Sequence, residues 1–230
     1  MKRNNTSLVI LLTLGVLISC ARAPQQLVSK KPAAPVVDLT SEKIRDSIVL
    51  IESENASGTG FFVAPDKIAT NIHSIAYAGP VSVKSSDKET NWTIEGVVAF
   101  DTKNKLVILK LTGEGTPLPL ADTVQIGESV FIPGYSDREY KVTKSSIQSI
   151  RKSNRWLRLN TTTSKKINGS PVLNNEGQVI GVIVPYGGYA VSSNVLEALL
   201  AEPMPMEPLT EWQQRKQVRA AVYYSLGKKN

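Results

Sequence analysis

Short segments rich in β-branched and other apolar residues follow one another along most of this 230-residue chain. Glycine, proline, asparagine or aspartate punctuates the gaps between them. The segments cover residues 48–53, 59–64, 81–86, 93–100, 106–111, 129–134, 156–161, 170–174 and 178–184. Because no long helical pattern lies between consecutive segments, the chain is predicted to fold as an all-β sandwich or barrel.

Helical patterns are confined to the ends of this region. One short helix is predicted to start at residues 40–42, and another is predicted over 195–201. After a proline-rich break, residues 209–226 form a helical pattern, with Thr210 and Gln213 spaced as in a capping box. This last helix has one apolar face, which we expect to pack on a barrel, with docking of a partner as the alternative.

Composition excludes several classes of protein. Hydrophobic residues make up 41% of the chain and charged residues 20%, which is typical of a globular protein and excludes global disorder and multiple membrane spans. A single cysteine and a single histidine exclude an internal disulfide, a cysteine-clustered metal site and a histidine-rich metal centre. We therefore expect neither a metal nor a cofactor.

The first twenty residues have the features of an export signal. Lys2 and Arg3 precede an apolar run over 8–18, which is shorter than the roughly 20 residues needed to span a bilayer. Residues 17–20 resemble the bacterial lipobox, whose cysteine receives fatty acyl chains such as palmitate before a peptidase cuts in front of it. The resemblance predicts a membrane anchor at Cys20, and an ordinary signal peptide with an incidental cysteine is the alternative.

The domain boundaries follow from this N-terminus. Residues 1–19 are predicted to be a lipoprotein signal peptide, and 20–38 a flexible tether rich in proline and alanine. Residues 39–202 are predicted to form the globular domain, and 203–230 a proline-rich linker and a C-terminal helix. The residue after Cys20 is alanine rather than aspartate, which favours the outer membrane as the address in the cell envelope.

Five segments in order resemble the trypsin-like serine peptidases, specifically the HtrA/DegP-type branch. The resemblance covers residues 44–200 and implies two six-stranded antiparallel β-barrels with the catalytic cleft between them. The segments are GTGFFVAP (58–65), ATNIHSIA (69–76), FDTKNKLVILKL (100–111), IGESVFIPGY (126–135) with KVTKSSIQSI (141–150), and INGSPVLNNEGQVIGVIV (167–184).

The resemblance assigns the three catalytic positions to residues that do not form a serine peptidase triad. The base position is His73, the acid position is Lys105, and the nucleophile position is Asn168. Lys166 replaces a glycine that contributes to the oxyanion hole. A triad needs a hydroxyl and a carboxylate on either side of the imidazole, and a lysine beside His73 disfavours the protonated imidazole. The pattern therefore predicts an inactive peptidase homologue that acts by binding a protein or peptide.

Two other functions stay open. A residual hydrolase could use Ser170 or Ser164 with His73, although no carboxylate would assist it. An acidic ligand could bind the region 138–166, where nine basic residues accompany one glutamate. The basic residues are Arg138, Lys141, Lys144, Arg151, Lys152, Arg155, Arg158, Lys165 and Lys166. Nucleic acid is not expected as a ligand, because an exported lipoprotein seldom meets it.

Overall fold

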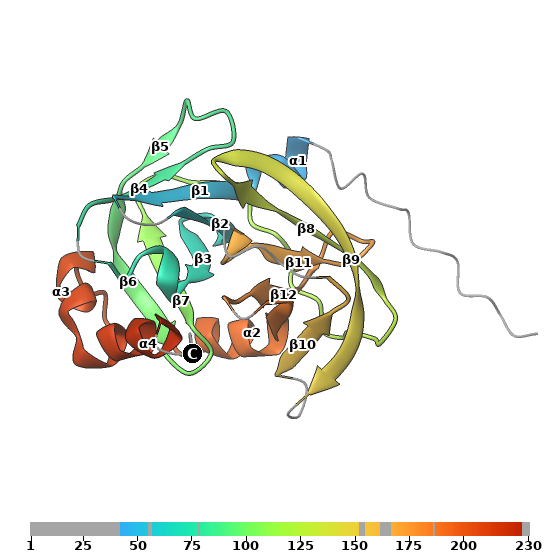
Figure 1. Cartoon of the computed structure of the whole chain (residues 1–230). Coiled ribbons are helices and arrows are strands. Elements are labelled where there is room, and N and C mark those ends of the chain that lie inside the picture. The colour runs from blue at the N-terminus through green and yellow to red at the C-terminus, as the bar shows by residue number, and fades with distance from the viewer. Residues whose placement is uncertain are drawn as a thin grey trace, which may run out of the picture. The chain divides into compact units, whose positions relative to one another are not determined.

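Two antiparallel β-sheets account for most of the computed structural model (Figure 1). The structure describes residues 42–54, 57–77, 79–151, 155–161, 167–185 and 187–226, with the backbone alone over 223–226. All of these residues belong to one unit of the chain, 34–230. The predicted signal peptide, Cys20 and the predicted tether lie outside the described residues.

The first sheet contains seven strands in the order β5-β4-β1-β2-β3-β7-β6. Neighbouring strands pair antiparallel, as in the register of Leu50 opposite Thr59. The strands are β1 (Ile48–Ser53), β2 (Ser57–Ala64), β3 (Lys67–Asn71), β4 (Val81–Lys84), β5 (Asn91–Trp92), β6 (Ile94–Asp101) and β7 (Leu106–Leu111). This sheet corrects the prediction of two six-stranded barrels, because it has a seventh strand and leaves β5 and β6 at its edges.

The second sheet closes into a six-stranded barrel in the order β10-β13-β12-β11-β8-β9, as predicted. Its longest hairpin joins β8 to β9 through Asp137 and Arg138, whose positive φ angles of 56° and 65° are those of a tight hairpin turn. The strands are β8 (Ser129–Ser136), β9 (Glu139–Arg151), β10 (Trp156–Leu159), β11 (Pro171–Leu173), β12 (Val179–Ile183) and β13 (Tyr189–Ser192). The predicted trypsin-like, mainly β fold is thus confirmed.

Three apolar cores hold these sheets together. Alternate residues of β1 point to opposite faces, so Leu50 lies in a core shared by both sheets while Ile51 lies in the core of the first sheet alone. A third core fills the closed barrel. Both faces of β1 are therefore buried, and this explains why residues 48–51 form a continuous apolar run rather than an alternating one.

The helices lie near the two ends of the described chain, except for one short turn inside the first sheet. They are α1 (Glu42–Asp46), η1 (Ile72–Ser74), α2 (Ser193–Ala201), α3 (Leu209–Gln214) and α4 (Lys216–Leu226). None of these helices has the length and apolar character needed to cross a lipid bilayer.

The helix predicted over 209–226 is divided in two. The backbone of Arg215 is extended, with ψ at 129°, and separates α3 from α4. Pro208 precedes α3 as its cap, so Thr210 lies inside the helix and the predicted capping box does not form. The break is stabilised by tertiary contacts, since the Arg215 guanidinium pairs with Glu207 and lies over the ring of Phe100.

Residues 203–208, predicted to be a linker, pair with the edge strand β6. The N–H of Met204 donates to the carbonyl of Val98 at 2.8 Å, and Val97 and Glu207 exchange two backbone hydrogen bonds. A side chain at Gly96 would come within 2.6 Å of the Glu207 carbonyl, so this close approach requires glycine. The segment covers an edge that would otherwise present unpaired backbone groups.

The C-terminal helices complete the core of the first sheet. Trp212 is fully buried and packs edge-on against Phe100, with ring centres 5.7 Å apart. The amide of Gln213 donates to the carbonyls of Ile75 at 2.7 Å and Tyr77 at 3.0 Å. Residues 203–222 are therefore an integral part of the described fold.

The substitution Trp212→Ala tests this role of the C-terminal segment. Loss of a fully buried indole should lower the free energy of unfolding by about 3–5 kcal/mol, measured by urea denaturation. The exposed Thr210 on the same helix provides the matched control, and Thr210→Ala should change stability by less than about 0.5 kcal/mol. Equal effects of the two substitutions would mean that α3 is not part of the cooperative fold.

Candidate functional site

His73 lies in the short helix η1, immediately after strand β3. Asn71 caps this helix, and its side-chain Oδ1 accepts the backbone N–H of His73 at 2.9 Å. The same oxygen lies 2.9 Å from Nδ1 of the imidazole. Because the backbone N–H can only donate, it fixes the amide orientation, and Nδ1 must therefore carry the ring proton. In a serine peptidase a carboxylate holds that nitrogen.

The surroundings of His73 favour its neutral form. The side chain is 9% exposed, and burial, followed by the positive charge of Lys105, lowers its pKa to about 4. An imidazole with this pKa is unprotonated at neutral pH and is a weak base. The electrostatics therefore oppose the imidazolium that acyl transfer requires.

Lys105, at the acid position, is a buried anchor between two parts of the fold. Its carbonyl accepts the N–H of Ile72 at 2.8 Å, which fixes it beside η1. Its ammonium donates to the backbone carbonyl of Ala221 in α4 at 3.1 Å. The carboxylate of the nearby Asp101 accepts hydrogen bonds from Lys103 and Asn104 of its own turn. The described contacts therefore give Lys105 a structural role.

Asn168, at the nucleophile position, begins a tight turn at the junction of the two sheets. Its carbonyl accepts the N–H of Thr59 in β2 at 2.9 Å, and the N–H of Ser170 returns to Ile167 at 3.1 Å. Gly169 between them has a φ of 82°, and a side chain there would come within 2.2 Å of the Thr59 carbonyl. The backbone conformation and the close packing of this turn thus require glycine at residue 169, whether or not the turn takes part in catalysis.

Of the two serines predicted as substitute nucleophiles, the structure describes only Ser170. Ser170 is fully buried. Its Oγ packs so closely on Gly134 that a Cβ at residue 134 would lie only 2.0 Å from it. The hydroxyl of Ser170 makes no hydrogen bond with the described residues. Ser164 and Lys166 lie outside the described residues. Burial of Ser170 against the backbone of β8 does not favour attack on a substrate.

Gly58 connects the base and nucleophile positions in space. A side chain built on Gly58 would come within 2.2 Å of Ser74 Oγ and 3.2 Å of the carbonyl of Asn168. The helix of His73 and the turn of Asn168 therefore both lie against the start of β2, as the resemblance implies. Sequence reasoning brought these positions together but missed Asn71, because the TNxH pattern does not show which atom of its amide faces the imidazole.

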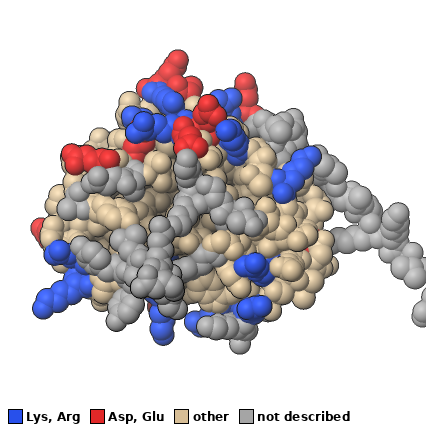
Figure 2. Space-filling view, in the orientation of Figure 1, with Lys and Arg blue, Asp and Glu red and all other residues tan. Residues whose placement is uncertain are grey.

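The basic region 138–166 lies on the second barrel, as far as its residues are described. Much of its charge is already engaged, since Arg138 pairs with Glu52 and Lys141 pairs with Glu139. Arg158 lies over the ring of Tyr189, 4.6 Å from its centre. Acidic groups are interspersed with basic ones along the upper edge of the molecule in Figure 2. Lys152, Lys165 and Lys166 lie outside the described residues.

Comparison with known proteins agrees with this geometry. Residues 58–182 match the family model described as a trypsin-like peptidase domain. The chain belongs to this family. It is 28% identical over 200 residues to the anti-sigma-I factor RsgI9 of Acetivibrio thermocellus, covering 80% of this chain and 27% of that protein. It is 27% identical over 161 residues to a probable periplasmic DegP-like serine endoprotease of Chlamydia trachomatis, covering 63% and 32%.

The fold of this family member is also found among solved structures. The active form of the Rv3671c protease of Mycobacterium tuberculosis superposes with a TM-score of 0.62 at 22% identity, covering 84% of this chain and 96% of that one. An identity this low supports the fold alone. Because the chain spans less than half the length of the relatives above, their activities do not carry over directly.

The protonation of His73 can be measured without ambiguity, because it is the only histidine in the chain. We expect NMR titration to give a pKa of about 4, and Lys105→Met to raise it while burial keeps it below the ordinary value. The matched control is Lys103→Met, which removes an exposed cation two residues away and should shift the pKa much less. An ordinary pKa in the parent protein would contradict the buried, neutral imidazole.

The same shift predicts how stability depends on pH. The folded state binds the proton of His73 less well than the unfolded state, whose pKa is near 6.5, so stability falls as the pH drops from about 6.5 toward 4. The contribution of this one group is about 3 kcal/mol, at about 1.4 kcal/mol for each pKa unit. His73→Gln should remove this component of the pH dependence in urea denaturation.

Proposed function

We propose that this protein is a catalytically inactive member of the trypsin-like peptidase family that binds peptides or proteins at the bacterial cell envelope. The observation that carries the proposal is the pairing at the former triad. The Nδ1 of His73 faces the neutral amide of Asn71, and the ammonium of Lys105 is directed to the Ala221 carbonyl. The Asn71 amide thus lies where a serine peptidase places its carboxylate.

This arrangement opposes each step of acyl transfer. A serine peptidase transfers the nucleophile's proton to the imidazole, and a carboxylate stabilises the resulting imidazolium. Here Lys105 destabilises that cation, and the side chain of Asn168 has no hydroxyl to attack a carbonyl. In subtilisin, loss of the nucleophile alone costs a factor of about 10⁶ in kcat. The buried Ser170 does not favour a replacement.

Peptide binding does not require these catalytic groups. Extended peptides can pair with an exposed strand edge through backbone hydrogen bonds, while pockets beside it select side chains. Both sheets and their shared apolar core are retained in this chain. Loss of the catalytic side chains with retention of the scaffold is therefore consistent with a binding function.

The N-terminus and the relatives support a place at the envelope. The lipobox-like residues 17–20 fit acylation of Cys20, and several acyl chains on one residue give a stable anchor. One relative named above is described as periplasmic. We therefore infer an exported protein anchored through Cys20, with the outer membrane favoured by the absence of aspartate at residue 21.

Reaction with a fluorophosphonate tests the absence of catalysis. The full-length protein, solubilised in detergent, should show no covalent adduct by intact mass, while an active trypsin-like peptidase labels under the same conditions. Casein fragments incubated with it should be retained on a filter without new cleavage products. An adduct that disappears in Ser170→Ala or His73→Ala would establish the residual hydrolase instead, and absence of both retention and cleavage would contradict peptide binding.

The anchor is tested by Cys20→Ser. Removal of the acylated thiol should move the protein from the membrane pellet and the detergent phase into the aqueous fraction, because the acyl chains are then lost. Metabolic labelling with a palmitate analogue provides the direct readout in the parent protein. A Ser19→Ala variant keeps the thiol and a small residue before it, so it should remain in the membrane. Equal partitioning of the Cys20→Ser variant and its parent would contradict the anchor.

A further inference from the structure

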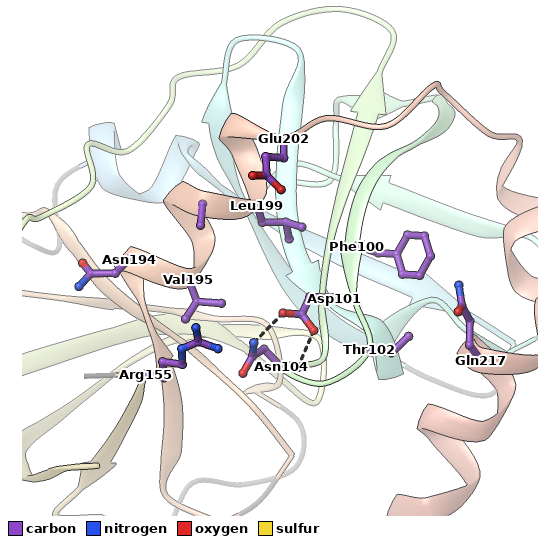
Figure 3. A pocket seen from close by; sticks show the side chains of 11 residues that line it. Phe100, Asp101, Thr102, Asn104, Arg155, Asn194, Val195, Leu199, Glu202 and Gln217 are labelled. Atoms are coloured by element: carbon purple, nitrogen blue, oxygen red, sulfur yellow. Dashed lines mark hydrogen bonds between the residues drawn. The ribbon is translucent and has the colours of Figure 1, made fainter. Parts of the chain in front are cut away.

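A cavity of about 620 Å³ lies outside the residues assigned to the former triad. It is bounded by the turn between β6 and β7, by α2, by α4 and by the residue that precedes β10 (Figure 3). Its volume is within the range of small-molecule sites in proteins. The lining residues are Phe100, Asp101, Thr102, Asn104, Arg155, Asn194, Val195, Ala198, Leu199, Glu202 and Gln217.

Opposite charges lie at the two ends of this cavity. The carbonyl of Arg155 accepts the N–H of Ser192 at 3.1 Å, which holds Arg155 beside the start of α2. Glu202 directly follows the last residue of the same helix, and Figure 3 shows these two side chains at opposite ends of α2. Neither Arg155 nor Glu202 forms an ion pair with another described residue. The helix dipole has the same direction as these charges, positive at its start and negative at its end.

The length of α2 sets the size of a ligand that could reach both charges. A nine-residue helix is about 13 Å long at 1.5 Å per residue. An extended peptide advances about 3.3 Å per residue, so about four residues would span this distance. A single amino acid, whose charges are separated by a few bonds, would reach only one end.

The walls between the two ends suit a peptide backbone and small side chains. Asn194 and Gln217 contribute amides from two different helices, and Val195 and Leu199 contribute apolar surface. The carboxylate of Asp101 accepts hydrogen bonds within its own turn, so Glu202 is the carboxylate left to receive a ligand. The combination of charged ends, amides and an apolar wall is that of a site for a short, dipolar chain.

We propose that this cavity binds a peptide of three or four residues with free termini, whose carboxylate pairs with Arg155 and whose ammonium pairs with Glu202. The peptide would run antiparallel to α2. This site deepens the proposed peptide binding at a place separate from the triad positions, since neither His73 nor Asn168 lines it. Two of its lining residues are close in sequence to the Lys105–Ala221 contact. Asn104 directly precedes Lys105, and Gln217 lies on α4, the helix that contains Ala221.

Isothermal titration of the full-length protein with tetra-alanine tests the proposal. The free-ended peptide should bind, and acetylation of its amine or amidation of its carboxylate should each weaken binding about tenfold, the loss expected for one charge-assisted hydrogen bond. Alanine itself should bind at least tenfold more weakly than the tetrapeptide. Absence of binding at millimolar peptide, or equal binding of the free and doubly blocked peptides, would overturn the proposal.

Matched substitutions assign each end of the peptide. Glu202→Gln should weaken binding of the free peptide about tenfold and make binding insensitive to acetylation of the peptide amine. Arg155→Gln should also weaken binding about tenfold and make it insensitive to amidation of the peptide carboxylate. Glu197→Gln on the same helix and Arg151→Gln on β9 change exposed charges that do not line the cavity, so they should bind as the parent does. Sensitivity to acetylation that persists in Glu202→Gln would overturn the assigned orientation.

Discussion

The apolar core shared by the two sheets is the contact on which the arrangement of this protein depends. Residues from β1, β2, β7, β12 and α2 meet in it, and it fixes how the first sheet lies against the closed barrel. The turn of Asn168 is held at this junction by the N–H of Thr59, and η1 lies against the same start of β2. The positions that the family resemblance assigns to the triad are therefore kept together by packing and backbone hydrogen bonds, which do not depend on catalytic side chains.

The lysine at the acid position also has a structural role. An ammonium at Lys105 has three donors and no acceptor, so it can satisfy the carbonyl of Ala221 where a carboxylate would be repelled. The same residue lowers the pKa of His73, and Asn71 takes over the orientation of the ring. Together these contacts show how one residue can both oppose the imidazolium and join α4 to the first sheet.

The C-terminal segment shows most clearly what local sequence cannot reveal. The proline-rich residues 203–208 suggest a linker, yet their backbone pairs with β6 because that edge has free hydrogen-bonding groups and Gly96 allows close approach. The helical pattern over 209–226 is correct in type, but it breaks at Arg215, where contacts with Glu207 and Phe100 outweigh the local preference for a continuous helix. The sequence also does not predict the strands β3, β9 and β13, although each pairs with the strand that precedes it in the chain. Their segments are short or rich in polar residues, so they lack the apolar runs on which the strand prediction depends.

The β-rich fold, most of its strands and the approximate place of the triad positions can be predicted from the amino-acid sequence alone. These features depend on side-chain periodicity, on turn residues and on the order of short motifs, all of which are local. The seven strands of the first sheet and the contact of Lys105 with α4 depend on the packing of elements that lie far apart in the chain. The hydrogen bond between Asn71 and His73 is local, but it depends on the turn of η1, which the TNxH pattern does not specify. Lys105 and Ala221 are 116 residues apart, so no short stretch of sequence encodes their contact. The same reason hid the cavity beside α2, whose walls come from four separate parts of the chain.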